Sequence, residues 1–286
     1  MVLDKVLAAH ADALPPFLYG TAWKEEHTGP LVELALRQGF RGIDTANQRK
    51  HYNEAAAGEA VAREIAAGTV AREELFLQTK FTHRPGQDQR LPYDPTAPVG
   101  EQVRQSFESS LEHLRTSYLD SYLLHGPSQR PGLAEQDWEA WFAMEALHAE
   151  GRVRALGVSN FDSEQLELLL DRTTVRPAFV QNRCFAATGW DWQMRQVCRE
   201  HGITYQGFSL LTANRGIWLG QRVAEVGDTH SLAPAQVIFC LALELGMLPL
   251  TGTTDTAHMD AALACRTEIL SAAEVTELEG IALRQG

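Results

Sequence analysis

The chain has 286 residues, 44% of them hydrophobic and 22% charged, which is typical of a soluble globular protein with a buried core. Its formal net charge of −12 argues against nucleic-acid binding, because phosphate neutralisation needs clustered Lys and Arg, although a local basic pocket for a phosphate-bearing cofactor stays compatible. No apolar run approaches the roughly 20 residues of a membrane span, and four scattered cysteines without a CxxC pair predict neither a metal site nor a disulfide framework.

The first twenty residues, MVLDKVLAAHADALPPFLYG, mix acidic residues and His10 into an apolar run that no basic segment precedes. This pattern is not that of a secretory signal peptide. Together with cysteines that are most simply interpreted as reduced thiols, it favours a cytoplasmic protein.

Short apolar segments then alternate with longer amphipathic ones along the chain. The short segments predict strands at 17–22, 40–46, 75–81, 119–125, 154–160, 178–183, 204–211 and 247–252. The amphipathic segments predict helices at 30–39, 54–67, around 103–114, at 138–151, 163–172, 192–202 and 234–246, and in the remainder of the chain. Glycine often closes a helix before the next strand, as at Gly39 and Gly202.

Strands that alternate with helices predict a parallel sheet with crossover connections. Eight such units in 286 residues fit an α/β fold of the (β/α)8 TIM-barrel type. A doubly wound open sheet is the alternative, but YGTAWKEEHTG after the first strand lacks the GxGxxG motif expected there. No linker or repeat divides the chain, so residues 1–286 are expected to form a single domain.

Polar residues end seven of the predicted strands, where the active sites of such barrels lie. These residues are Asp44, Lys80, His125, Ser159 with Asn160, Gln181 with Asn182, Ser209, and the segment TGTTD at 251–255. Each of them has an alternative role as a structural cap. Seven in succession, among them a carboxylate, an amine and an imidazole, favour a functional site.

Asp44 and Lys80 follow apolar residues on neighbouring predicted strands, which lie about 4.8 Å apart in a sheet. The carboxylate and the ammonium can therefore pair at the barrel mouth. This pair is either structural or a device in which Lys80 lowers the pKa of a nearby phenol, which could then donate a proton near neutral pH. His125 on the next strand would add a hydrogen-bond donor.

In their order and spacing, several segments resemble the aldo-keto reductases over nearly the whole chain. They are GFRGIDTA, YNEAAAGEAV, LFLQTKF, LDSYLLHGP, GRVRALGVSNF, FVQNR, GITYQGFSLL and LPLTGTTDTAHM. The resemblance implies a (β/α)8 barrel that reduces carbonyls with a nicotinamide cofactor and without a metal. Three members of the family's catalytic Asp, Tyr, Lys and His match Asp44, Lys80 and His125.

The resemblance also implies where the nicotinamide end of the cofactor binds. Ser159 and Asn160 would hold the carboxamide, and Gln181 would join them. Phe208 stands where the family usually has a tyrosine that stacks on the nicotinamide ring, and a phenylalanine can stack in the same way.

The phosphates would lie along a second group of residues. These are Ser209, Leu210, Gly252, Thr253 and Thr254, whose backbone N–H groups and hydroxyls suit phosphate; an ordinary helix-capping loop is the alternative for the last three. His258 replaces the basic residue that usually contacts the 2′-phosphate of NADP, with Asp255 and Asp260 close by. NADP is therefore the expected cofactor, and NAD is the alternative.

The tyrosine of the catalytic set is displaced in this chain. The family usually has four residues between Asp and Tyr, and here seven separate Asp44 from Tyr52, so the segment NQRKHY is about three residues longer. Counting back from Asn53 puts His51 at the tyrosine position. We predict Tyr52 as the proton donor because Lys80 can tune a phenol, whereas it would push His51 toward neutrality; an exposed Tyr52 without a catalytic role is the alternative.

Trp23 and Phe81, at predicted strand ends, and His51 are the candidate substrate contacts, although Trp23 and Phe81 are equally compatible with core packing. The predicted function is NAD(P)H-dependent reduction of a small-molecule carbonyl or imine by a monomer or a homodimer. A cofactor-binding regulatory subunit that binds a partner with little turnover is one alternative. A lyase or aldolase that uses Lys80 as a Schiff-base amine is another.

Overall fold

The computed structural model describes residues 14–283, so the prediction about a signal peptide falls largely outside the described residues. Eight parallel strands close into a barrel in chain order, with β8 pairing back onto β1. They are β1 Leu18–Gly20, β2 Gly42–Asp44, β3 Phe76–Phe81, β4 Leu119–Leu124, β5 Val153–Ser159, β6 Phe179–Arg183, β7 Thr204–Phe208 and β8 Leu248–Thr251. The predicted (β/α)8 barrel is confirmed, whereas a single domain over 1–286 stays a prediction.

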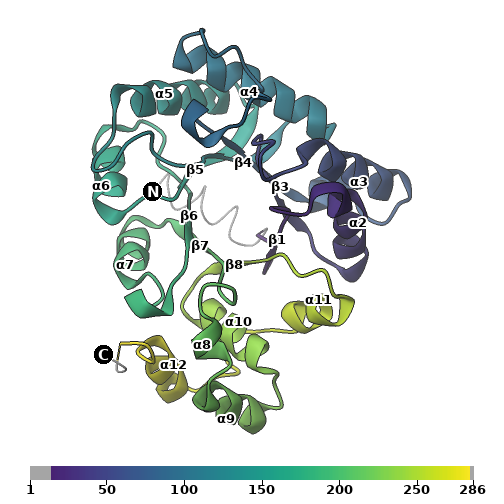
Figure 1. Ribbon diagram of the computed structural model, residues 1–286, viewed down its shortest axis with the longest axis vertical. Helices are drawn as coiled ribbons and strands as arrows, with labels where there is room; N and C mark the ends of the chain where they lie inside the picture. The colour runs from purple at the N-terminus through teal and green to yellow at the C-terminus, as the bar shows by residue number, and fades with distance from the viewer. Residues whose placement is uncertain (1–13, 284–286) are drawn as a thin grey trace.

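Helices surround the ring of strands (Figure 1). They are α2 Thr28–Gln38, α3 Glu54–Ala66, α4 Val99–Leu114, α5 Glu135–Ala149, α6 Ser163–Arg172, α7 Trp192–His201, α8 Arg215–Trp218, α9 Gln221–His230, α10 Pro234–Glu244, α11 Thr256–Leu263 and α12 Ala272–Glu279. Helices α8 and α9 were not predicted individually. Helix α9 buries few residues, chiefly Val223 and Val226, so its apolar period is weak in the sequence.

Alternation along the strands decides which side chains face the barrel interior. One end of the interior is filled by an apolar cluster of Leu18, Phe76, Leu123, Ala155, Phe179, Leu248 and Leu250. Two residues further along their strands, Asp44, Gln78 and Gln181 face inward and form a polar layer. The interior therefore changes from apolar to polar toward the C-terminal ends of the strands.

The larger core lies between the strands and the helices, where outward-facing residues such as Tyr19, Ile43 and Tyr122 are buried. Helices α3 and α4 approach closely at Gly58, where an added Cβ would overlap the backbone of His113. All four cysteines are buried and free. Within residues 14–283, no helix has both the length and the apolar character that a membrane span requires.

Candidate functional site

Asp44 and Lys80 form a buried ion pair at the C-terminal ends of β2 and β3. Lys80 Nζ lies 2.7 and 2.8 Å from the two Asp44 carboxylate oxygens and donates to the carbonyl oxygen of Thr45 at 2.7 Å. Lys80 is fully buried, and Asp44 is 3% exposed. Burial lowers the pKa of Lys80, and the Asp44 carboxylate opposes that shift.

Amide side chains from strands across the barrel hold the Asp44 carboxylate. Gln78 Nε2 and Gln181 Nε2 donate to Asp44 Oδ1 at 2.7 and 2.9 Å. Gln206 on β7 accepts from both amides, at 2.8 and 3.0 Å. Gln78 and Gln206 were missed by the sequence analysis, although a glutamine at an inward position of an apolar strand was a usable signal. Gln181 Nε2 is engaged in this layer, and its contact with a nicotinamide stays a prediction.

A tight turn accommodates the lengthened segment after β2. The backbone N–H groups of His51 and Tyr52 both donate to Gln48 O at 3.1 Å, so residues 49–51 project outward as a turn. The segment is held at its other side, where Trp23 N donates to His51 O at 2.7 Å. The extra residues are therefore absorbed locally, and the chain returns to the barrel mouth at Tyr52.

Tyr52 lies beside Lys80 and His125. Lys80 Nζ is 5.4 Å from the centroid of the Tyr52 ring, and the ring centroids of Tyr52 and His125 are 5.9 Å apart in an edge-to-face arrangement. The structure thus brings together the four residues predicted to be catalytic. Burial, with a further contribution from the Asp44 carboxylate, raises the pKa of Tyr52 above its usual value.

This direction corrects the expectation that Lys80 lowers the pKa of the phenol. The Lys80 ammonium is paired with Asp44, so the two charges largely cancel at the phenol, and desolvation dominates. Tyr52 therefore holds its proton at neutral pH. A phenol in this state can still give a proton to an alkoxide, which is a stronger base.

His125 follows β4 with its ring Nδ1 2.7 Å from Thr82 Oγ1. Burial, then the charges of Lys80 and His51, lowers the pKa of His125 well below its usual value of 6.5. The imidazole is therefore neutral near pH 7. If the Thr82 hydroxyl donates to Nδ1, the proton lies on Nε2, which can then donate to an oxygen at the mouth.

The lowered pKa of His125 predicts a loss of stability in mild acid. Below pH 6.5 the unfolded chain binds a proton at this residue that the folded protein does not, so the free energy of unfolding falls as the pH falls. His125→Gln should reduce this slope by at most about 1.4 kcal/mol per pH unit. Urea unfolding of both proteins at pH 7.5, 6.5 and 5.5 measures it, and equal slopes would refute the assignment.

The three candidate substrate contacts have different surroundings. Trp23 is 68% exposed, and its ring stacks on His51 with centroids 3.9 Å apart. Phe81 is fully buried and packs against Tyr93 and His83 in the outer core, so it does not line the mouth. The reason is alternation: Lys80 faces the interior, and the next residue on the strand must face outward.

The residues predicted for the nicotinamide end gather around the ends of β5 to β7. Ser159 Oγ donates to Gln181 O at 2.8 Å, and Asn160 Nδ2 donates to His125 O at 2.8 Å. Phe208 is partly buried, and the guanidinium of Arg183 lies 5.7 Å from its ring centroid. Arg183 was not predicted, although as an ion on the last inward position of β6 it could have been.

The phosphate end centres on the loop between β8 and α11. Gly252 lets this loop pass close to β1, since an added Cβ would lie 3.1 Å from Gly20 O. Lys24 Nζ contacts the carbonyl oxygen of Gly252, so an unpredicted ammonium lies at the loop. His258 is exposed and lies 3.8 Å from the Asp255 carboxylate, which also accepts a hydrogen bond from His258 N.

The remaining residues of this loop complete a donor set that fits a phosphate-bearing cofactor. Thr254 is exposed, Thr253 is partly buried, and Ser209 adopts a left-handed backbone conformation with φ of 58° next to the buried Leu210. Among residues 14–283, no group of three or more His, Cys, Asp or Glu side chains is arranged to hold a metal ion.

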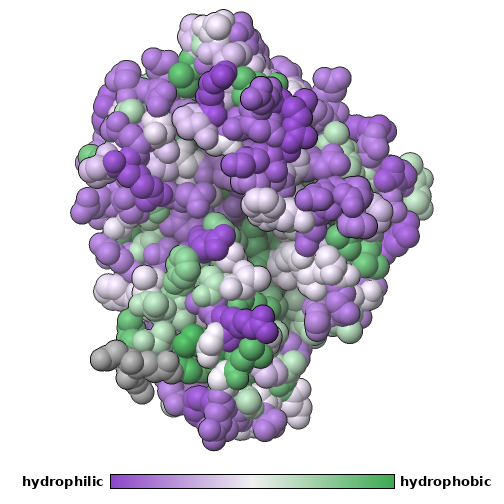
Figure 2. Space-filling view, in the orientation of Figure 1, coloured by the Kyte–Doolittle hydropathy of each residue, from purple (hydrophilic) through white to green (hydrophobic). Residues whose placement is uncertain are grey.

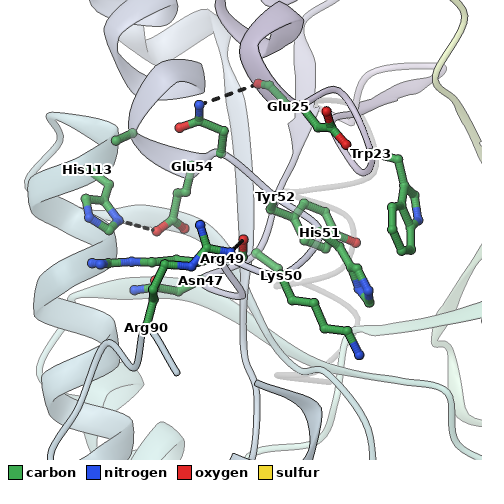
Figure 3. A pocket seen from close by; sticks show the side chains of 13 residues that line it. Trp23, Glu25, Asn47, Arg49, Lys50, His51, Tyr52, Glu54, Arg90 and His113 are labelled. Atoms are coloured by element: carbon green, nitrogen blue, oxygen red, sulfur yellow. Dashed lines mark hydrogen bonds and ion pairs between the residues drawn. The ribbon is translucent and has the colours of Figure 1, made fainter. Parts of the chain in front are cut away.

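A cavity of about 590 Å³ lies beside the barrel mouth, between the turn after β2, helix α3 and helix α4. It is lined by Trp23, Glu25, Ala46, Asn47, Arg49, Lys50, His51, Tyr52, Asn53, Glu54, Ala55, Arg90 and His113 (Figure 3). It therefore reaches Tyr52 but not Lys80 or the residues predicted for the cofactor. Figure 2 shows that the face seen in Figure 1 is hollowed near its centre, with hydrophilic residues prevailing above the hollow.

Comparison with known proteins gives consistent results. The sequence model of the Aldo/keto reductase family matches residues 18–283. The glyoxal reductase of Bacillus subtilis is 34% identical over 218 residues, covering 76% of this chain and 70% of the relative. The methylglyoxal reductase DkgA of Salmonella typhimurium is 32% identical over 232 residues, covering 79% and 74%. The structure of the aldose reductase from Schistosoma japonicum superposes with a TM-score of 0.80 at 24% identity, covering 94% of this chain and 89% of that one.

Proposed function

Because the chain belongs to the aldo/keto reductase family of oxidoreductases, we propose that it reduces an aldehyde or ketone with NADPH as its cofactor. The observation that carries the proposal is the convergence of Tyr52, Lys80, Asp44 and His125 at one end of the barrel. The names of two relatives, a glyoxal reductase and a methylglyoxal reductase, support a small carbonyl substrate. A cytoplasmic location stays a prediction.

Tyr52 is the proposed proton donor to the oxygen of the substrate carbonyl. When bound, the nicotinamide cofactor supplies the hydride. His125, neutral and held by Thr82, orients the carbonyl oxygen toward the phenol. Lys80 and Asp44 place a fixed ion pair behind the Tyr52 ring, and the Lys80 charge stabilises negative charge as it develops on oxygen.

The surroundings of Lys80 favour this role over Schiff-base chemistry. Its amine is fully buried and donates to three oxygen atoms, two from Asp44 and one from Thr45. An amine that must attack a carbonyl needs a free lone pair and access to the substrate. The same ion pair would serve equally in a regulatory subunit, so turnover itself must be measured.

The residues that would hold the cofactor form two groups. Ser159, Asn160 and Phe208 would contact the nicotinamide end. The loop Gly252 to Thr254, together with Lys24, would contact phosphate through N–H groups, hydroxyls and one ammonium. Lys24 supports a preference for the more highly charged NADPH, whereas the acidic Asp255 beside His258 opposes it.

Fluorescence titration of the protein with NADPH and NADH, followed by a panel of aldehydes and ketones, tests the proposal. We expect tighter binding of NADPH and reduction of small aldehydes. Lys24→Met should weaken NADPH binding about tenfold, because one charge-assisted contact contributes roughly 1.5 kcal/mol. Absence of binding for both cofactors would contradict the reductase assignment, and binding without turnover would favour the regulatory alternative.

A further inference from the structure

The turn after β2 carries positive charge to the cavity beside Tyr52. Arg49 and Lys50 are exposed at the tip of this turn, and Arg90 reaches the same cavity from the segment before α4. Figure 3 shows Lys50 and His51 extending toward the side of Trp23, while Arg49 and Arg90 lie toward His113. The proposed proton transfer uses neither Arg49 nor Lys50.

The charges that line the cavity do not cancel. Arg90 is bound to Asp88, and the buried Glu54 is bound to His113 and Thr79. Among the described residues, Arg49 and Lys50 have no carboxylate within ion-pair distance.

The remaining carboxylate, Glu25, does not offset these two cations locally. In Figure 3 it lies at the edge of the cavity away from Lys50 and Arg90. The positive charge also extends toward the reacting centre, since the Lys50 charge contributes to the lowered pKa of His51, and the His51 charge to that of His125. In a protein of net charge −12, this is a local region that attracts anions.

We propose that this cavity is an anion subsite and that the preferred substrates are aldehydes or ketones bearing a carboxylate or phosphate group. The inference rests on the proposed function, because it assigns the substrate class of the same site. The carbonyl oxygen lies at Tyr52 and His125, and the anionic group lies at Lys50 and Arg49. The turn that lengthens the segment after β2 thus supplies the selectivity, and Tyr52 at its end supplies the proton.

A matched pair of substrates tests the subsite. With NADPH present, 4-formylbenzoate should be reduced with a kcat/KM at least tenfold above that of its methyl ester, mainly through a lower KM. Lys50→Met combined with Arg49→Met should bring this ratio close to 1. Arg176→Met, which removes an exposed arginine between α6 and β6, should leave it at the wild-type value. A wild-type ratio near 1 would overturn the proposal.

Two further arms identify the nature of the attraction. Raising the ionic strength from about 0.01 to about 1 M shortens the Debye length from about 30 to about 3 Å and should lower the ratio of acid to ester. Replacing the carboxylate by phosphate, with 4-formylphenyl phosphate, shows which anion is preferred. A higher kcat/KM than the ester for either anion supports the subsite, and a lower value for both refutes it.

Calorimetry separates failure of the subsite from failure of the proposed function. With NADP⁺ present, 4-(hydroxymethyl)benzoate should bind at least tenfold more tightly than its methyl ester, and the double variant should abolish the difference. If neither aldehyde is reduced but this difference is found, the reductase proposal fails and the subsite stands. Equal affinities in the wild-type protein would refute the subsite whatever the turnover.

Discussion

Tyr52→Phe is expected to lower kcat for carbonyl reduction by about 10²–10⁴-fold, the usual contribution of a positioned general acid. The substitution removes the phenolic O–H and keeps the ring that lies 5.4 Å from Lys80 Nζ and 5.9 Å from the His125 ring. The fold and the cofactor affinity should therefore be retained. Steady-state kinetics, together with fluorescence titration of the cofactor, measures both quantities.

His51→Gln is the matched comparison, because His51 is adjacent in the chain and is the other candidate proton donor. Its ring stacks on Trp23, and its pKa is lowered by burial and by Lys50. We expect the His51 variant to lose less than tenfold in kcat. Near-normal turnover by the Tyr52 variant, with a large loss in the His51 variant, would transfer the role to His51.

Lys80→Met should both abolish turnover and destabilise the fold by about 3–5 kcal/mol, the usual cost of leaving one partner of a buried ion pair uncompensated. Asp44 would stay buried with two amide donors but without a counter-charge. Because a domain is typically stable by about 5–15 kcal/mol, the variant should still fold. Urea unfolding gives the stability, and cofactor titration shows whether the barrel mouth is intact.

The double variant Lys80→Met, Asp44→Asn separates the two effects. Removing the carboxylate charge as well should recover part of the lost stability, because no uncompensated ion remains, while turnover stays lost. Lys50→Met, which removes an exposed ammonium, should change the unfolding free energy by less than about 0.5 kcal/mol. Additive losses in the double variant would show that Asp44 and Lys80 do not interact in the folded protein.

The barrel was predictable because its signals are local. Each strand is a short apolar run, each main helix has an apolar face, and glycines such as Gly39 and Gly202 end helices with left-handed backbones. The positions of Asp44, Lys80 and His125 at strand ends followed from the same pattern. Phe81 could have been placed by alternation, since an inward Lys80 forces it outward.

Other features depend on contacts between distant segments. Gln78 and Gln206 are 128 positions apart and meet only because the barrel closes. The electrostatics of Tyr52 reverse for a similar reason. A sequence shows Lys80 near a phenol, but it does not show that Asp44 neutralises the ammonium or that the surrounding side chains exclude water.

The chain's local patterns were enough to specify the (β/α)8 fold, the family and the residue types at the barrel mouth, because apolar period and strand-end chemistry act over a few residues. The tertiary structure decided where Tyr52 lies. The lengthened segment reaches the mouth because Gln48 O closes a turn and Trp23 N, from another strand connection, binds His51 O. The same folding placed Arg49 and Lys50 at one cavity with Arg90, a grouping of charge that depends on segments about forty residues apart.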